Sequence, residues 1–142
     1  MLMLAGPILR RVTSQKVAMW FATSEEVSLS LRFQIDGQAF FEEISSIADH
    51  TVHLIAGRHL HFYLLDVSLE TVLPDDTKIY YDLKLNGQGW QDWAEDLVYP
   101  DEGLPFFVIR PKVQNLLHGS CRKPHFQSGD GLCRADDLLK AL

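Results

Sequence analysis

Apolar and polar residues alternate along much of the chain before residue 111, and the alternation is strictest in Val27–Ile35. Every second residue of that run is Val, Leu, Phe or Ile, and the residues between them are Ser, Arg or Gln. Side chains of an extended strand point alternately to opposite faces. The run therefore predicts a strand with one buried face and one face in water.

Similar runs predict seven or eight strands in this region. Asp36-Gly37 has the residues of a hairpin turn, and Gln38–Ile44 follows it as the returning strand. Because no helical pattern separates the strands, we expect an all-β domain, a two-sheet sandwich of the immunoglobulin or fibronectin type III-like kind. The other predicted strands are Ile8–Thr13, Lys16–Ala22, Thr51–Ala56, His59–Leu69, Ile79–Leu85 and Leu104–Arg110.

The strand that begins after Leu73-Pro74 and Thr77 resembles the sixth strand of fibronectin type III domains. In those domains a tyrosine hydroxyl pins the preceding corner of the chain. Parity selects Tyr81 rather than Tyr80 for that role here, because Tyr81 shares a face with the apolar residues of the strand.

Composition narrows the class of protein. The chain has 142 residues, of which 46% are hydrophobic and 23% charged, which favours a globular fold. It has neither an apolar run of about 18 residues nor a secretory signal, so we expect no membrane partner. Its two cysteines cannot build a disulfide framework, and a cytoplasmic location is the default expectation.

Charge divides the chain near Pro111. Residues 1–111 contain 8 Lys or Arg and 16 Asp or Glu, a net charge of −8, whereas residues 112–142 contain 5 and 3, a net charge of +2. The acidic part argues against contact with nucleic acid, because phosphate binding requires clustered cations. We therefore expect a sandwich domain over residues 1–111 and a different segment after it.

The pattern of residues 112–142 is that of an α/β unit. An apolar run ends at Cys121, a polar loop follows over residues 122–129, and a helical pattern with five Leu or Ala positions runs from Gly131 to Leu142. A strand, a loop and a helix open such a unit. We expect this segment to be the beginning of a truncated α/β domain, and the chain to be a fragment of a longer protein.

Four of the six histidines lie close together in the sequence, at His50, His53, His59 and His61. A metal site needs ligands that converge. If Gly57-Arg58 is a two-residue turn, His61 pairs with Leu54, and His53 lies on the face opposite His59 and His61. The expected arrangement is therefore a solvated strand face rather than a metal site.

Trp90 and Trp93 follow a glycine-rich turn. Exposed aromatic rings on a sandwich can stack on sugars. Nothing else nearby supports sugar binding, so we expect the two rings to cover one end of the core.

The run His118–His125 places two His, a Ser, a Cys and two cations within eight residues. Cations beside Cys121 favour its thiolate, which is both a nucleophile and a metal ligand. A cysteine phosphatase loop does not fit, because Ser120 precedes the cysteine and Gln127 stands where an arginine is needed. A hydrolase that uses Cys121 and His125 stays open as an alternative.

The layout of the whole chain resembles the PhoD-like alkaline phosphatase family of metallophosphoesterases. The resemblance rests on five segments: Gly6–Thr13, Val17–Trp20, His118–His125, Gly129–Leu132 and Ala135–Leu139. The most specific of these are His118–His125 and Gly129–Leu132.

The resemblance implies an N-terminal sandwich joined to an α/β catalytic domain that holds iron and calcium. It implies that Cys121 is an iron ligand of the parent enzyme, that the substrate is a phosphoester and that the sandwich packs against its own catalytic domain. The remaining ligands lie on later strands that this chain lacks, and a catalytic metal needs three or more. We therefore expect no catalytic residue and no bound cofactor in this chain alone.

Other residues of the C-terminal segment are expected to be structural. Cys133 fits a packing role, and the acidic residues near the predicted helix start, Asp130, Asp136 and Asp137, fit the positive end of a helix dipole. The alternative to the phosphoesterase interpretation is a stand-alone fibronectin-like module that binds a partner or a sugar.

Overall fold

The computed structural model describes residues 1–38, 40–44, 47–99, 101–113 and 135. Met1–Pro111 form one compact unit and Lys112–Leu142 a second. The division falls where the charge changes sign. The predicted strand, loop and helix after residue 113 lie outside the described residues, apart from Ala135.

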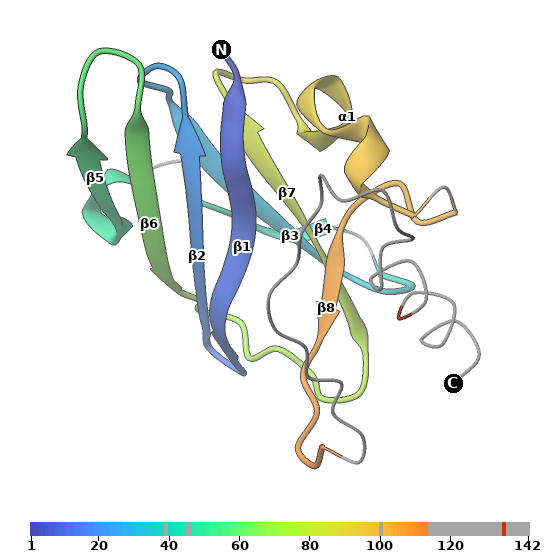
Figure 1. Ribbon diagram of the computed structural model, residues 1–142. Coiled ribbons are helices and arrows are strands. Elements are labelled where there is room, and N and C mark those ends of the chain that lie inside the picture. Colours follow the sequence, from blue (N-terminus) through green and yellow to red (C-terminus); the bar gives the residue numbers. More distant parts are fainter. Residues whose placement is uncertain (39, 45–46, 100, 114–134, 136–142) are drawn as a thin grey trace. The chain divides into compact units, whose positions relative to one another are not determined.

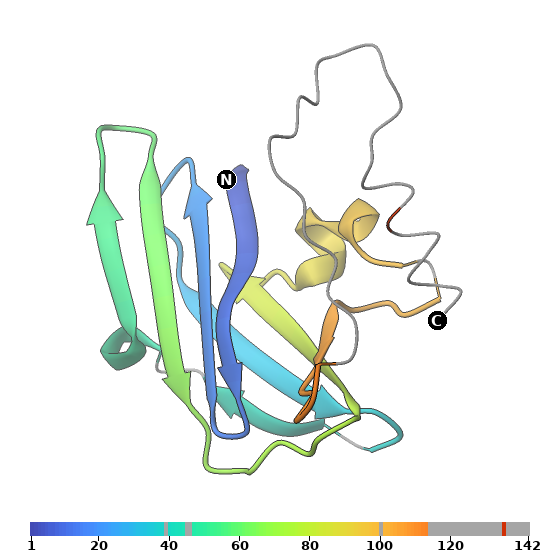
Figure 2. The same cartoon turned by 60° about the horizontal axis from the view of Figure 1, so that its bottom comes forward.

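The first unit is a sandwich of two four-stranded antiparallel sheets (Figures 1 and 2). This confirms the predicted fold class. One sheet, which we call sheet A, has the order β1 (Met3–Thr13), β2 (Lys16–Thr23), β6 (His61–Ser68) and β5 (Thr51–Ile55). The other, sheet B, has the order β4 (Phe40–Ile44), β3 (Leu29–Ile35), β7 (Lys78–Leu85) and β8 (Phe106–Val108).

The core lies between the sheets and is built from the inward side chains of the central strands. Burial alternates residue by residue along β6 and along β7, as the strand period requires. The alternation predicted for Val27–Ile35 is confirmed, since Leu31 and Phe33 are fully buried and Arg32 and Gln34 are not. The fully buried side chains include Val17, Met19, Phe21, Leu31, Phe33, Leu65, Val67, Ile79, Leu83 and Leu85.

The predicted hairpin turn between β3 and β4 forms at Asp36-Gly37. Gly37 has a φ of 70°, and the Gln38 N–H donates to the Ile35 carbonyl at 3.0 Å. A positive φ costs glycine little because it has no Cβ.

The expectation that no helix separates the strands of the sandwich is wrong, because three short helical turns lie among its described residues. A single α-helical turn, α1 (Trp90–Trp93), follows β7, and two 3-10 turns lie at Ala48–His50 and Glu95–Leu97. In Figure 1, α1 lies beyond the end of β7. Elements this short carry no hydrophobic period that a sequence pattern could detect.

Tyr81 faces the core as its parity predicts, but its hydroxyl does not pin a corner. Its side chain is 6% exposed and packs against Trp90 and Phe107, and among the described residues the hydroxyl has no hydrogen-bond partner. Burial raises the pKa of Tyr81 to about 12.

Tyr63, rather than Tyr81, forms a hydrogen bond that links the two sheets. The Tyr63 hydroxyl on β6 accepts a hydrogen bond at 3.0 Å from the buried backbone N–H of Val27, just before β3. This bond ties sheet A to the segment that enters sheet B. The Tyr63 ring also stacks on Phe21 at 5.0 Å between ring centroids.

We predict that Tyr63→Phe lowers the free energy of unfolding by about 1–3 kcal/mol, because it leaves the buried Val27 N–H without an acceptor. Urea denaturation followed by tryptophan fluorescence measures the change. Tyr81→Phe is the matched control, since it removes the same atom from the same core, and we expect it to change stability by well under 1 kcal/mol. A larger loss for Tyr81→Phe than for Tyr63→Phe would restore the corner role to Tyr81.

Candidate functional site

The residues of the C-terminal segment that were predicted to carry chemistry lie outside the described residues. This applies to the run His118–His125, to Cys121 as the expected iron ligand, and to Cys133, Asp130, Asp136 and Asp137. The sites that can be built from coordinates are therefore those of the sandwich.

The predicted pairing of β5 with β6 is wrong by one residue. Ile55 rather than Leu54 stands opposite His61, and His53 stands opposite Tyr63. The connection is not a two-residue turn at Gly57-Arg58, because the Ala56 N–H donates to the Leu60 carbonyl at 2.8 Å and closes a longer loop. A shift of one residue moves a side chain to the other face of a sheet, so His53 and His61 lie on the same face.

The two imidazoles are in direct contact. His53 Nε2 lies 3.1 Å from His61 Nδ1, and the His53 ring stacks on Tyr63 with 4.4 Å between centroids. His61 is 8% exposed, so this pair belongs to the end of the core. Such a hydrogen bond requires one ring to accept, and that ring must be neutral.

Of the four histidines, His53 and His61 are the two that the structure brings into contact. His50 and His59 are exposed, and within the described residues no group of three or more His, Cys, Asp or Glu side chains could hold a metal ion. The juxtaposed pair therefore fits a structural hydrogen bond under the Ala56–Leu60 loop.

The two tryptophans close one end of the core, as predicted. Trp90 is 3% exposed and its ring lies 4.5 Å from that of Trp93, whose Nε1 donates to the Leu83 carbonyl at 3.3 Å. A ring as buried as Trp90 offers no stacking platform to a sugar.

Asp82 holds the helix in place by accepting the Trp90 N–H at 2.8 Å, and the Asp92 carboxylate accepts the Gly89 N–H at 2.9 Å.

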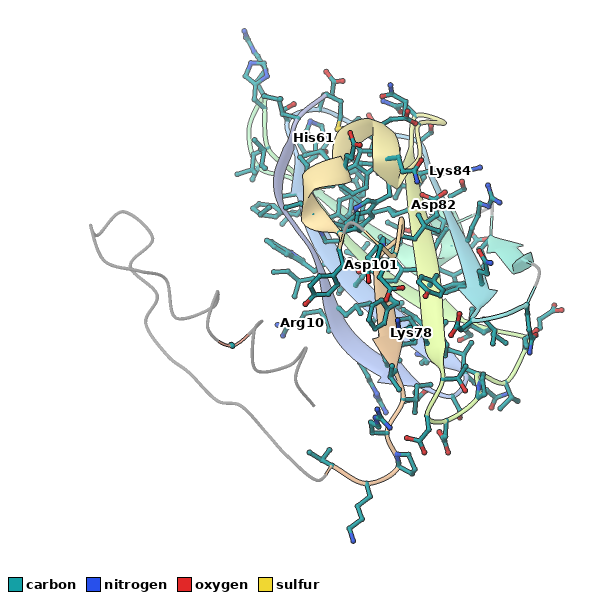
Figure 3. All side chains as sticks on the ribbon, turned by 90° about the vertical axis from the view of Figure 1, so that its right-hand side faces the viewer. Arg10, His61, Lys78, Asp82, Lys84 and Asp101 are labelled. Carbon is teal, nitrogen blue, oxygen red and sulfur yellow. The ribbon has the colours of Figure 1, made fainter. Side chains whose placement is uncertain are left out.

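A charged network that sequence reasoning missed lies on the outer face of sheet B. Glu102 forms an ion pair with Lys78 of β7 and accepts a 2.5 Å hydrogen bond from the Tyr80 hydroxyl. The Lys78 ammonium lies 4.7 Å from the centre of the Phe106 ring. Figure 3 shows Lys78, Asp82 and Lys84 along β7. The available signal was a Lys and a Tyr two residues apart on one face of a predicted strand, but their partner is 24 residues away from Lys78.

The pKa of Glu102 is shifted by its two partners, and the pKa of each partner is shifted by Glu102. Hydrogen bonds from Lys78 and Tyr80 hold the pKa of the Glu102 carboxyl below its usual range. The same carboxylate raises the pKa of Lys78 and raises that of Tyr80 to about 12. The network therefore stabilises the fold at neutral pH. Its contribution is lost as pH falls through the lowered pKa of Glu102 and as pH rises towards the raised pKa of Tyr80.

Each oxygen of Glu102 has a partner in its own chain, Lys78 on one and Tyr80 on the other. The network fastens the segment after α1 to β7. It gives the sandwich an ordered, charged outer face on sheet B.

Comparisons of the chain with family models, with curated proteins and with solved structures find no match. No helix within the described residues is long and apolar enough to cross a membrane.

We predict that Glu102→Gln lowers the pKa of Tyr80 from about 12 towards its usual value near 10. The substitution removes the hydrogen bond to a carboxylate that is the main cause of the raised pKa, and it removes the charge that opposes tyrosinate. Ultraviolet titration of tyrosinate measures this step. Tyr81 is an internal control, since its pKa of about 12 comes from burial and should not move. An unchanged Tyr80 step in the variant would contradict the assignment.

Proposed function

We propose that the chain is the N-terminal part of a PhoD-like metal-dependent phosphoesterase, consisting of a complete β-sandwich and the first strand, loop and helix of its catalytic domain. The observation that carries this proposal is the His118–His125 run followed by Gly129–Leu132, the most specific of the motifs shared with that family. The parent enzyme would hydrolyse phosphoesters in the cytoplasm.

Two structural observations support the proposal without testing it. The family joins an immunoglobulin-like or fibronectin-like domain to its catalytic domain, and the first unit of this chain is a two-sheet sandwich. The compact units divide at Pro111, which is seven residues before the motif run begins at His118.

In this proposal Cys121 is an iron ligand of the parent, and calcium is the second kind of metal. The described residues hold no group of three metal-ligating side chains, so they do not complete a site for either ion. The chain by itself is proposed to be non-catalytic, and its partner is its own catalytic domain. Its acidic sandwich is proposed to make no contact with nucleic acid.

The stand-alone interaction module is the second candidate, and one observation favours it. Sheet A carries large apolar side chains on its outer face, among them Val52, which is 65% exposed, and Leu54, which is 61% exposed. Such a face fits a binding partner. For the sugar-binding version of this candidate, Trp90 is buried and Trp93 is half-buried.

We predict that the longer natural protein contains iron and hydrolyses a generic phosphoester such as p-nitrophenyl phosphate or its diester analogue, and that Cys121→Ala removes most of both. Elemental analysis and the chromogenic assay measure the two effects. The reason is that loss of one thiolate from a metal site weakens binding strongly.

Cys133→Ala is the matched control, because a cysteine with a packing role leaves iron content unchanged. The 142-residue chain alone should neither retain iron through gel filtration nor hydrolyse the ester. Iron that survives Cys121→Ala in full would refute the ligand assignment, and a natural gene product that stops at Leu142 would refute the parent enzyme.

A further inference from the structure

The outer face of sheet A, whose strands lie in the order β1-β2-β6-β5 (Figure 1), carries apolar side chains on all four strands. In one row, Ile8 pairs with Trp20, Trp20 with Leu64, and Leu64 with Val52. In the next row, Ala22 pairs with Phe62 and Phe62 with Leu54. We call these seven residues the sheet A patch.

Four apolar side chains of these rows are open to solvent, whereas Ala22, at one end of the second row, is only 1% exposed. Ile8 is 48% exposed, Leu64 41%, Val52 65% and Leu54 61%. Trp20 and Phe62 lie side by side between them, with 6.0 Å between ring centroids. A contiguous apolar surface of this breadth marks an interaction site rather than ordinary surface scatter.

The sequences of the two sheets indicate that the outer face of sheet A packs against another surface and that the outer face of sheet B is in water. In β2 the run Val17–Ala22 has no polar residue, so both faces of this central strand are apolar. In β3 and β7 the outward positions are polar or charged, including Gln34, Asp82 and Lys84. A strand that is apolar on both faces is typical of a sheet packed on both sides.

The sheet A patch is complementary to itself. A two-fold axis parallel to the strands exchanges β1 with β5 and β2 with β6, because the sheet order is β1-β2-β6-β5. It therefore sets Trp20 of one copy against Leu64 of the other and Ile8 against Val52. In the next row it sets Phe62 of one copy over Ala22 of the other, which is 1% exposed.

Charges beside the patch follow the same symmetry. The next row contains Arg11 on β1, opposite Ala18, and Asp66 on β6, also opposite Ala18. The two-fold axis sets Asp66 of one copy against Ala18 of the other, one strand spacing of about 4.8 Å from Arg11. Asp66 also pairs with Lys16 of its own chain at 2.8 Å. An arginine side chain spans one strand spacing, so Arg11 of the other copy would join this pair at each end of the row.

We propose that the sheet A patch is a homodimer interface, in which two copies pack their outer faces of sheet A against each other through an isologous two-fold contact. Sheets that pack face to face lie about 10 Å apart. The side chains of the sheet A patch fill that space, while the polar face of sheet B stays in water on both copies.

Sedimentation velocity of the 142-residue chain over a range of concentrations tests the proposal. We expect a species of twice the 16.2 kDa monomer mass. Leu54→Lys should raise the dimer dissociation constant at least about tenfold, because it places a charge against the apolar surface of the other copy. Val72→Lys is the matched control, since Val72 is 60% exposed and lies in a loop outside the patch, and it should leave the dimer intact.

A charge exchange tests the symmetry itself. Arg11→Glu and Asp66→Arg should each weaken the dimer, and the double variant should recover most of the loss. A chain that stays monomeric at all concentrations, a dimer indifferent to Leu54→Lys, or a double variant without recovery would overturn the proposal. In a monomer, hydrogen-exchange protection over Val52–Leu54 would indicate that another segment of the chain covers the patch.

Discussion

The burial of one row of side chains from each central strand holds the two sheets of this protein together. Phe21 and Leu65 of sheet A face Phe33 and Leu83 of sheet B in a core from which these four side chains are wholly withdrawn from water. Shortening one such side chain to alanine costs about 2–5 kcal/mol, a large part of the stability of a domain. The ends of the sandwich and its charged outer face are therefore arranged around a core that fixes the register of every strand that contributes to it.

Most of the strand faces could be predicted from the sequence pattern, and particular residues explain why the pairing of β5 with β6 could not. In Val27–Ile35 polar and apolar residues alternate strictly, so parity decides which face is buried. In β6 the run Phe62-Tyr63-Leu64-Leu65 is apolar on both faces, so parity gives no decision, and only the loop length can set the pairing. The Ala56–Leu60 loop is longer than the turn suggested by Gly57, which is why the pairing of His53 with Tyr63 could not be predicted.

The candidate sites were harder to predict than the fold because they depend on contacts between distant residues. The Tyr63 hydroxyl reaches a backbone N–H 36 residues earlier, and nothing in the alternation distinguishes it from Tyr81. Glu102 finds Lys78 and Tyr80 through a segment with no regular pattern. The run around Cys121, by contrast, was singled out by its local composition alone, lies outside the described residues and stays a prediction.

The position of β5 at the edge of sheet A has a consequence for how the protein behaves in concentrated solution. Within the described residues β5 pairs only with β6, so one row of its backbone amides and carbonyls is available to another extended chain. The other edge, β1, is interrupted by Pro7, which has no N–H to offer, and Pro105 adjoins the short β8. Natural sheets guard their edges with such residues, and Thr51–Ile55 has none of them. The strand is therefore the point at which an intermolecular sheet, and with it aggregation, would begin.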